Sequence, residues 1–309
     1  MKGPLFYAKI LLFGEYGIIK NAKGLSIPYN YYKGALRLDN IHEEAAIQSN
    51  KKLLEFAKHL IHIDLDLVQF DLKRLHADLN KGMYFDSSIP QGYGVGSSGA
   101  LVAAIYDRYA LDKVTVLENL TRTKLTKLKS IFSEMESFFH GKSSGLDPLN
   151  SFLSLPILIH SKSNIEPTGI PSQTPDSKAA VFLLDSGMTS ETAPMVSIFM
   201  DNLEVPAFRN MLKHEFISIS DSCIEHFLSG DIHALFSDVK KLSSIVLHNF
   251  KPMIPTHFHN LWKKGLDTNA YYLKLCGSGG GGYILGFTQD LPKAKALLGD
   301  HQIEVVYQF

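Results

Sequence analysis

Pro90-Gln-Gly-Tyr-Gly-Val-Gly-Ser-Ser-Gly-Ala100 is the stretch on which our interpretation of this sequence is built. It precedes an apolar segment, Leu101–Tyr106, that is typical of a helix. Glycines let the backbone turn tightly, so that successive N–H groups converge on one point at a helix N-terminus. Free N–H groups and the positive end of the helix dipole favour phosphate there, and Ser97 and Ser98 add hydroxyls for phosphate or a metal. The stretch therefore predicts a nucleotide-binding loop.

Two familiar glycine loops do not fit this stretch. A P-loop ends in Lys-Ser or Lys-Thr, and no lysine occurs between Lys81 and Lys113. Residues 94–99 do spell the dinucleotide-binding pattern, but that fold needs a strand ending in an acid about twenty residues later. Residues 115–139 read instead as one long helix, opened by a capping-box pattern at Thr115-Val-Leu-Glu118. A tight turn before a buried helix is the alternative that the loop alone leaves open.

Length and composition indicate a soluble protein of two domains. The chain has 309 residues, of which 45% are hydrophobic, enough for a sizeable core. Lys+Arg and Asp+Glu are both 31, so no net charge attracts nucleic acid or an anionic membrane. The only cysteines, Cys223 and Cys276, suggest reduced thiols in the cytoplasm. No apolar run is long enough for a signal peptide or a membrane span, so we expect neither a membrane nor a nucleic-acid partner.

The rest of the chain alternates between predicted strands and helices. Residues 6–13 read as a buried strand in which Lys9 is costly unless it meets an anion or snorkels at the strand end. Extended structure is also expected at Ile18-Ile19, and residues 161–178, with three prolines, are the best linker candidate. Further strands are predicted at 25–28, 34–38, 68–72, 83–85, 179–185, 270–276, 283–287 and 303–308, and helices at 43–62, 207–228, 231–249, 256–265 and 292–298.

Two later segments also suggest ligand binding. Glu136 and His140 share a helix face at positions i and i+4, before a small-residue loop, 141–147, that on its own reads as a turn. Gly277–Gly282 holds five glycines in six residues between two predicted strands, more than a hairpin needs. Close approach to another backbone or to a ligand explains them better. His248, His257 and His259 lack zinc spacing and a carboxylate partner, so we interpret them as ordinary histidines.

Taken together, four segments resemble the superfamily of galactokinase, homoserine kinase, mevalonate kinase and phosphomevalonate kinase (GHMP kinases). Lys9-Ile-Leu-Leu-Phe-Gly-Glu-Tyr16 is similar to the first family motif, residues 90–100 to the second, and residues 274–282 to the third. Glu136 with His140-Gly-x-x-Ser-Gly-Leu-Asp147 is similar to the segment that carries the metal ligand and base in mevalonate kinases. The motifs follow the family's order along the chain.

The resemblance implies an α+β fold of two domains with ATP between them. Residues 1–175 would form a domain like ribosomal protein S5 domain 2, and residues 176–309 a ferredoxin-like domain. The implied activity is transfer of the ATP γ-phosphate to the hydroxyl of mevalonate with Mg²⁺, for isoprenoid precursor synthesis. The partners would be ATP and a small hydroxylated acid such as mevalonate, and a homodimer stays open.

The resemblance also implies roles for individual residues. Asp147 would be the base that faces the acceptor hydroxyl, and Lys9 would lie beside it, while Ser98 and Glu136 would hold Mg²⁺. The nucleotide-binding residues would be Pro90, Gly92, Gly94, Val95, Gly96, Ser97, Ser98 and Gly99. The acceptor-binding residues would be Glu15, Tyr16, His140, Ser144, Gly145, Thr192, Gly277, Ser278 and Gly279.

Departures from the family pattern fall on the acceptor side. Tyr7-Ala8 replace the usual Pro-Gly before the lysine, Tyr16 stands where many mevalonate kinases have His, Ser143 stands where Pro is usual, and Ser190-Glu191 precede Thr192 without the common basic residue.

Three alternatives therefore stay open. A phosphomevalonate kinase would need extra cations near its acceptor, and Lys142 and Lys274 are candidates. A decarboxylase of the same fold would depart from the lysine and the second motif, which are kept here. A non-catalytic sensor would have lost Lys9, Glu136 or Asp147, and all three are present.

Overall fold

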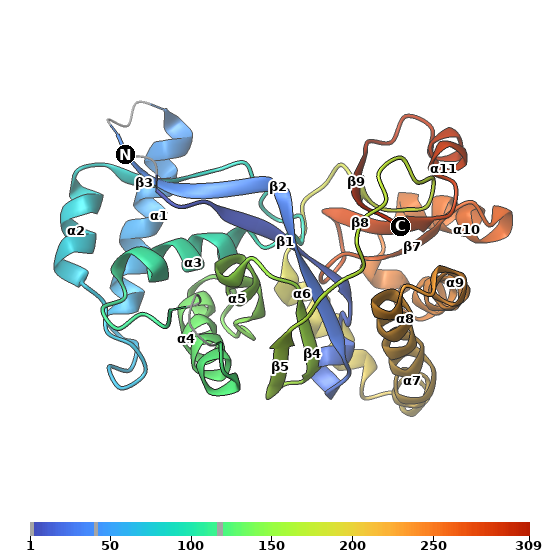
Figure 1. Ribbon diagram of the computed structural model, residues 1–309, viewed down its shortest axis with the longest axis horizontal. Helices are drawn as coiled ribbons and strands as arrows, with labels where there is room; N and C mark the ends of the chain where they lie inside the picture. Colours follow the sequence, from blue (N-terminus) through green and yellow to red (C-terminus); the bar gives the residue numbers. More distant parts are fainter. Residues whose placement is uncertain (1–2, 40–42, 116–119) are drawn as a thin grey trace. The chain divides into compact units, whose positions relative to one another are not determined.

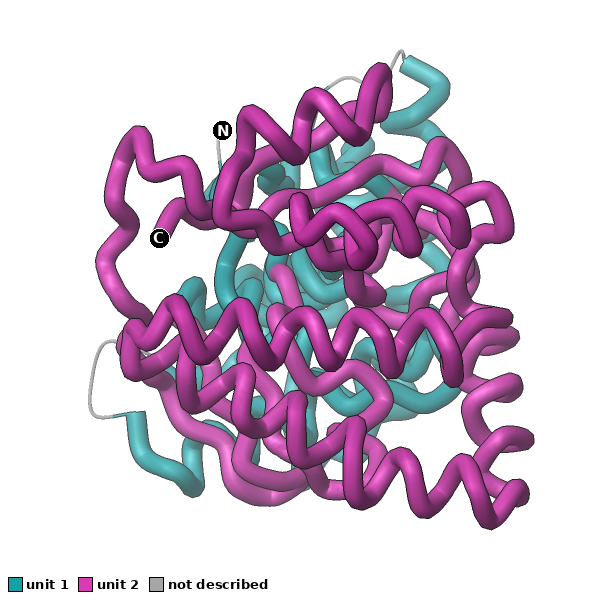
Figure 2. Tube along the Cα trace, turned by 90° about the vertical axis from the view of Figure 1, so that its right-hand side faces the viewer, with its two compact units in different colours: residues 1–9, 27–90, 96–155 teal, residues 10–26, 91–95, 156–309 magenta. Residues whose placement is uncertain are grey.

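The computed structural model describes residues 3–39, 43–115 and 120–309 and divides the chain into two compact units (Figure 1, Figure 2). Unit 1 comprises residues 1–9, 27–90 and 96–155, and unit 2 comprises residues 10–26, 91–95 and 156–309. Each unit combines helices with strands, as the sequence predicts. The domain boundary expected between residues 175 and 176 remains a prediction.

Helix α3 is the centre of unit 1. It packs against α4 and α5 (Figure 1). Residues 99–106 are all buried, because a helix that is apolar on every side must be covered on every side. The described helices of unit 1 are α1 (Glu44–Leu60), α2 (Leu72–Asn80), α3 (Ser97–Tyr109), α4 (Arg122–His140) and α5 (Leu146–Leu153).

The first sheet has the strand order β1-β2-β4-β5, with β3 also paired to β2. The long strand β2 makes this possible, since its far end pairs with β3, Leu38 opposite Met83, and its start pairs with β4, Gly24 opposite Ile159. All of these pairings of β2 are antiparallel. The strands are β1 (Phe6–Phe13), β2 (Gly24–Leu38), β3 (Met83–Ser87), β4 (Ile157–Ser161) and β5 (Asn164–Pro167).

The second sheet belongs to unit 2 and has the antiparallel strand order β7-β8-β6-β9. Its first strand in sequence, β6, therefore lies between the third and the fourth, which is the ferredoxin-like arrangement that the family resemblance implies. Residues 180–184 of β6 have no exposed surface, so this strand forms the core of unit 2. The strands are β6 (Ala180–Asp185), β7 (Tyr272–Leu275), β8 (Tyr283–Thr288) and β9 (Ile303–Gln308).

Most helices of unit 2 lie in the connection between β6 and β7, and α11 joins β8 to β9. Trp262 anchors this layer, because its ring is fully buried and its Nε1–H donates to the Ser243 carbonyl at 3.1 Å. The helices are α6 (Thr192–Asn202), α7 (Pro206–Met211), a π-helical turn (Leu212–Phe216), α8 (Ile217–Ser229), α9 (Ile232–Asn249), α10 (His259–Thr268) and α11 (Leu291–Leu298). Short 3-10 turns occupy Gly17–Lys20, Lys251–Met253 and Thr256–Phe258.

Some predicted elements were wrong. In residues 68–72 only Phe70 makes an isolated bridge, to Ala110, and α2 begins at Leu72 because Asp71 caps it by accepting the Arg74 N–H at 2.9 Å. Ile18-Ile19 lie in a 3-10 turn rather than a strand. The linker predicted at 161–178 instead begins with the end of β4 and the whole of β5.

The helix predicted from residue 115 begins later, at Arg122. Thr121 caps it by accepting the Lys124 N–H at 3.3 Å. Residues 116–119, including Glu118 of the predicted capping box, lie outside the described residues. Within residues 3–39, 43–115 and 120–309, no helix combines the length and apolar character needed to cross a membrane.

Candidate active site

The N-terminus of α3 lies against the strand lysine and the first turn of α5. Gly96 caps α3 with φ of 82°, and a Cβ there would lie 3.0 Å from Cγ of Lys9. A Cβ on Gly99 would lie only 2.7 Å from the carbonyl carbon of Asp147. Glycine at these two positions therefore lets both neighbours approach the helix N-terminus closely.

Lys9 forms an ion pair with Asp147. The Lys9 Nζ lies 2.9 Å from Asp147 Oδ1, although 138 residues separate the two in sequence. The lysine is 4% exposed, whereas the aspartate side chain is 38% exposed. The buried cation thus has the anionic neighbour that its place in a strand requires, and the carboxylate keeps an accessible side.

Ser98, Glu136 and His140 form a hydrogen-bonded group next to this pair. The Ser98 hydroxyl donates to Glu136 Oε1 at 3.1 Å and lies 3.0 Å from His140 Nε2. Glu136 is 3% exposed, and both Glu136 and His140 come from one face of α4, as their spacing predicts. Gly141 ends this helix with φ of 70°.

Ser143 also contacts the candidate site, although its sequence pattern predicts no role there. Its hydroxyl donates to Glu136 Oε2, and its Oγ accepts the Gly145 N–H at 3.0 Å. Gly145 has φ of 70°, and a Cβ there would lie 2.2 Å from the carbonyl oxygen of Lys129. The replacement of the family's usual proline by Ser143 was the only sequence signal of this contact.

The pKa of Glu136 is shifted by burial and by a neighbouring charge. Burial, and then the negative charge of Asp147, raise the pKa of Glu136 to about 8, although its hydroxyl partners and Lys9 act the other way. Burial, assisted by Lys52, lowers the pKa of His140. The buried Glu136 carboxylate thus lies within reach of the negative charge of the partly exposed Asp147, and a divalent cation would relieve this repulsion.

The donor set fits Mg²⁺ held jointly with a phosphate. The part of the chain that the structure describes contains no group of three or more His, Cys, Asp or Glu side chains able to hold a metal alone. Mg²⁺ prefers hard oxygen ligands and commonly takes only one or two protein ligands beside phosphate oxygens and water. Ser98 and Glu136 supply a hydroxyl and a carboxylate that touch each other, so they suit this kind of site.

In unit 2, the second glycine cluster packs against the start of the glycine loop. A Cβ on Gly94 would lie 2.6 Å from the Cys276 carbonyl oxygen, and one on Gly282 would lie 2.5 Å from Cα of Tyr93. The Tyr283 N–H also donates to the Tyr93 carbonyl at 3.3 Å. The excess of glycine in this cluster therefore allows close approach of two backbones, one of the two explanations that the sequence predicts.

Glu15 and Tyr16 are both buried in unit 2. The Glu15 carboxylate forms an ion pair with Lys274, and the two residues are 6% and 3% exposed. The Tyr16 hydroxyl donates to the Ser278 carbonyl at 2.6 Å, and its ring stacks on Phe199 with centroids 4.6 Å apart. Burial, and then the charge of Glu15, raise the pKa of Tyr16.

Comparison with known proteins identifies a family model that covers part of this chain. Residues 57–154, which include the N-terminus of α3 and the loop up to Asp147, match the family model of the GHMP kinases N terminal domain. The chain carries a GHMP kinase N-terminal domain. The resemblance read from the motifs is thereby confirmed. The chain matches none of the curated protein sequences with which it was compared.

Solved structures extend the GHMP kinase fold to the whole chain. L. major mevalonate kinase in complex with R-mevalonate is 19% identical, with a TM-score of 0.65, over 96% of this chain and 90% of that chain. Streptococcus pneumoniae phosphomevalonate kinase in complex with phosphomevalonate and AMPPNP is 13% identical, with a TM-score of 0.65, over 99% of each chain. Lactococcus lactis galactokinase complexed with galactose is 11% identical, with a TM-score of 0.59, over 98% of this chain and 92% of that chain. At these identities the likeness establishes the fold.

The other residues that the family resemblance selects are distributed as follows. Ser144 and Thr192 are exposed, the latter at the first position of α6. Val95 is buried, and the Gly279 carbonyl accepts the Ser190 hydroxyl at 2.6 Å. The roles of these residues, of Pro90 and of Gly277 in a GHMP kinase site remain predictions.

The three C-terminal histidines contact backbone carbonyls. His248 lies 2.7 Å from the Ser244 oxygen, His257 lies 3.3 Å from that of Ser186, and His259 contacts two carbonyls. These contacts agree with their interpretation as ordinary histidines.

Proposed function

We propose that this protein is an ATP-dependent kinase that phosphorylates the hydroxyl of mevalonate. The observation that carries the proposal is the Lys9–Asp147 ion pair beside the hydrogen-bonded Ser98 and Glu136 at the N-terminus of α3. Phosphoryl transfer needs mainly positioning and neutralisation of charge. This group of residues offers a helix N-terminus, a cation, a buried carboxylate and an accessible carboxylate in one place.

The first turn of α3 supports binding of the nucleotide phosphates. Its free N–H groups and the hydroxyls of Ser97 and Ser98 are donors for phosphate oxygens, and Gly96 leaves room for them. Ser98 and Glu136 would hold Mg²⁺, which, when bound, neutralises charge that develops on the phosphates.

Asp147 is the residue that we assign to the acceptor hydroxyl. Its exposed side can accept a hydrogen bond from an alcohol, which aligns the alcohol oxygen for attack and later gives the carboxylate its proton. Lys9, held 2.9 Å away, balances the negative charge of Asp147 and of the alkoxide that forms. Burial of Lys9 limits the positions that its side chain can adopt.

Mevalonate is our preferred acceptor for two reasons. The segment from Glu136 to Asp147 has the mevalonate kinase pattern, and a fold relative binds R-mevalonate. A phosphorylated acceptor would need additional free cations, and Lys274 already forms a buried ion pair with Glu15. Only the exposed Lys142 then remains of the two lysines considered for that purpose.

The remaining expectations accompany this proposal. Both cysteines, Cys223 and Cys276, are buried, which fits reduced thiols at the expected cytoplasmic location. The assembly as a homodimer, the place in isoprenoid precursor synthesis and the domain boundary at residues 175 and 176 stay predictions.

Coupled measurement of ADP release tests the proposal. Mevalonate, phosphomevalonate, galactose and homoserine should be compared at equal concentrations, and we expect turnover with mevalonate to exceed the others. Asp147→Asn should reduce turnover by about 10²-fold or more while an ATP analogue still binds. The exposed Asp112→Asn is the matched control. Turnover with none of the four acceptors, or an active Asp147→Asn variant, would contradict the proposal.

A further inference from the structure

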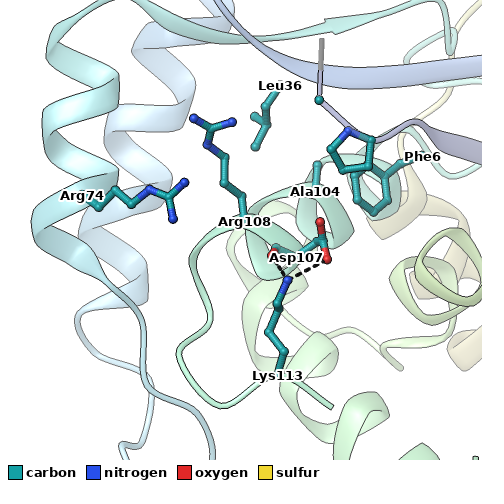
Figure 3. Close-up of a pocket in the computed structure, with 9 residues that line it drawn as sticks. Phe6, Leu36, Arg74, Ala104, Asp107, Arg108 and Lys113 are labelled. Carbon is teal, nitrogen blue, oxygen red and sulfur yellow. Dashed lines mark hydrogen bonds and ion pairs between the residues drawn. The ribbon is translucent and has the colours of Figure 1, made fainter. Parts of the chain in front are cut away.

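A cavity of about 220 Å³ lies in unit 1 beside the C-terminal end of α3 (Figure 3). Arg108 in the last turn of α3 lines it, whereas Ser98 lies in the first turn. At 1.5 Å per residue, these two positions are about 15 Å apart along the helix. The cavity is therefore separate from the candidate active site. Its lining residues are Gly3, Pro4, Phe6, Leu36, Arg74, Ala104, Asp107, Arg108 and Lys113.

The lining has a cationic side and an apolar side. Figure 3 shows the guanidinium groups of Arg74 and Arg108 on one side of the cavity and the ring of Phe6 on the other. Both guanidinium carbons lie 5.7 Å from the centroid of the Tyr109 ring. Two cations thus contact the same aromatic side chain.

These cations are only partly neutralised by protein carboxylates. Asp78 Oδ2 accepts from Arg108 at 2.9 Å and from the Tyr109 hydroxyl at 2.8 Å. Lys113 pairs with Asp107 at 3.1 Å. Among the described residues, the Arg74 guanidinium makes no hydrogen bond or ion pair; it contacts the Tyr109 ring, and its charge acts on Asp78, the carboxylate that already pairs with Arg108. One positive charge is therefore left over beside the apolar wall.

We propose that this cavity binds a small phosphate monoester with a short apolar body. The phosphate would accept hydrogen bonds from the forked N–H groups of Arg74 and from the N–H groups of Arg108 that do not donate to Asp78. The carbon chain would contact Phe6, Leu36 and Ala104. A water-sized group occupies about 30 Å³, so a cavity of about 220 Å³ has room for roughly seven non-hydrogen atoms. Ethyl phosphate has that size, so it is the probe of choice.

Calorimetric titration of the full chain with ethyl phosphate tests this site. A saturating non-hydrolysable ATP analogue is present, so that the N-terminus of α3 is occupied. We expect millimolar binding by the wild type and at least a tenfold loss of affinity in Arg74→Gln, since a charge-assisted hydrogen bond is removed. Arg74 is exposed, so this variant should fold normally.

Lys73→Gln is the matched control, because Lys73 is the preceding residue of α2, is exposed and does not line the cavity. The affinity of the Lys73→Gln variant for ethyl phosphate should stay within twofold of that of the wild type. Equal losses in the two variants, or no binding at millimolar concentration, would overturn the proposal. Propionate should bind at least tenfold more weakly than ethyl phosphate, and equal affinity would overturn the assignment to a phosphate.

Discussion

Replacing Glu136 by Gln should remove a large pH dependence from the stability of the metal-free protein. Glu136 is 3% exposed, accepts hydroxyl hydrogen bonds from Ser98 and Ser143, and lies near the charge of Asp147. Its pKa is raised from the ordinary 4.5 to about 8, first by burial and then by that charge. Gln keeps the shape and the acceptor oxygen but carries no charge at any pH.

The sign and size of the effect follow from this pKa. The folded state holds the Glu136 proton more tightly than the unfolded state, so its contribution to stability is fully present below pH 4.5 and is lost as pH rises to about 8. At about 1.4 kcal/mol per pH unit, the loss between pH 4.5 and pH 7 is roughly 3 kcal/mol. Mg²⁺ requires the charged carboxylate, so it should stabilise the wild type more at pH 8 than at pH 5.

Urea unfolding from pH 4.5 to pH 8, with EDTA or with Mg²⁺, measures both effects. The Glu136→Gln variant should not lose stability as the pH rises, and Mg²⁺ should not stabilise it. Glu134→Gln, an exposed position on the same helix, should behave like the wild type. If the free energy of unfolding changes with pH equally in the wild type and in Glu136→Gln over this range, the reasoning about this carboxyl group is refuted.

Three further predictions concern other residues of the two units. His140→Gln keeps a polar partner for Ser98, so its half-maximal Mg²⁺ concentration for turnover should stay within threefold of the wild type. His140→Leu removes that partner and should raise this concentration about tenfold. Equal values for the two variants would show that the contact between His140 and Ser98 does not affect the Mg²⁺ requirement. Lys274→Met should lower the free energy of unfolding by about 3–5 kcal/mol, because Glu15 then stays buried without a cation. Adding Glu15→Gln should recover most of this loss. A loss under about 1 kcal/mol in denaturant titration of Lys274→Met would contradict the prediction. Gly145→Ala should lower the melting temperature more than Gly141→Ala, since both glycines have φ of 70° but only Gly145 faces a backbone oxygen at 2.2 Å; equal melting temperatures would argue against the clash.

The glycine loop and the helix after it were predictable because their signals are local. Gly96 does take a left-handed conformation, and α3 starts at Ser97, as glycine spacing followed by an apolar run predicts. Local signals also misled. Residues 68–72 alternate in the manner of a strand, but Asp71 is a good N-cap and the helix it starts decides the structure.

The contacts of the candidate site were less accessible to sequence reasoning. Nothing local to Lys9 or Asp147 reveals that they meet, and only the resemblance to GHMP kinases suggested it. The hydrogen bond from Ser143 to Glu136 depends on how the loop after α4 folds back on its own helix, so residue type and spacing could not give it. Likewise, Lys274 was considered as a ligand for an acceptor phosphate, whereas a tertiary contact commits it to Glu15.

The composition of the two units has a consequence for how this protein can be divided. Strand β1 contributes residues 6–9 to unit 1 and residues 10–13 to unit 2, and the five residues 91–95 belong to unit 2 although unit 1 continues on both sides. No single cut of the polypeptide therefore releases either unit complete: a fragment from residue 156 onward would lack residues 10–26 and 91–95. Neither half should survive as an autonomous fragment, and gene fusion or domain shuffling should transfer this protein only as a whole.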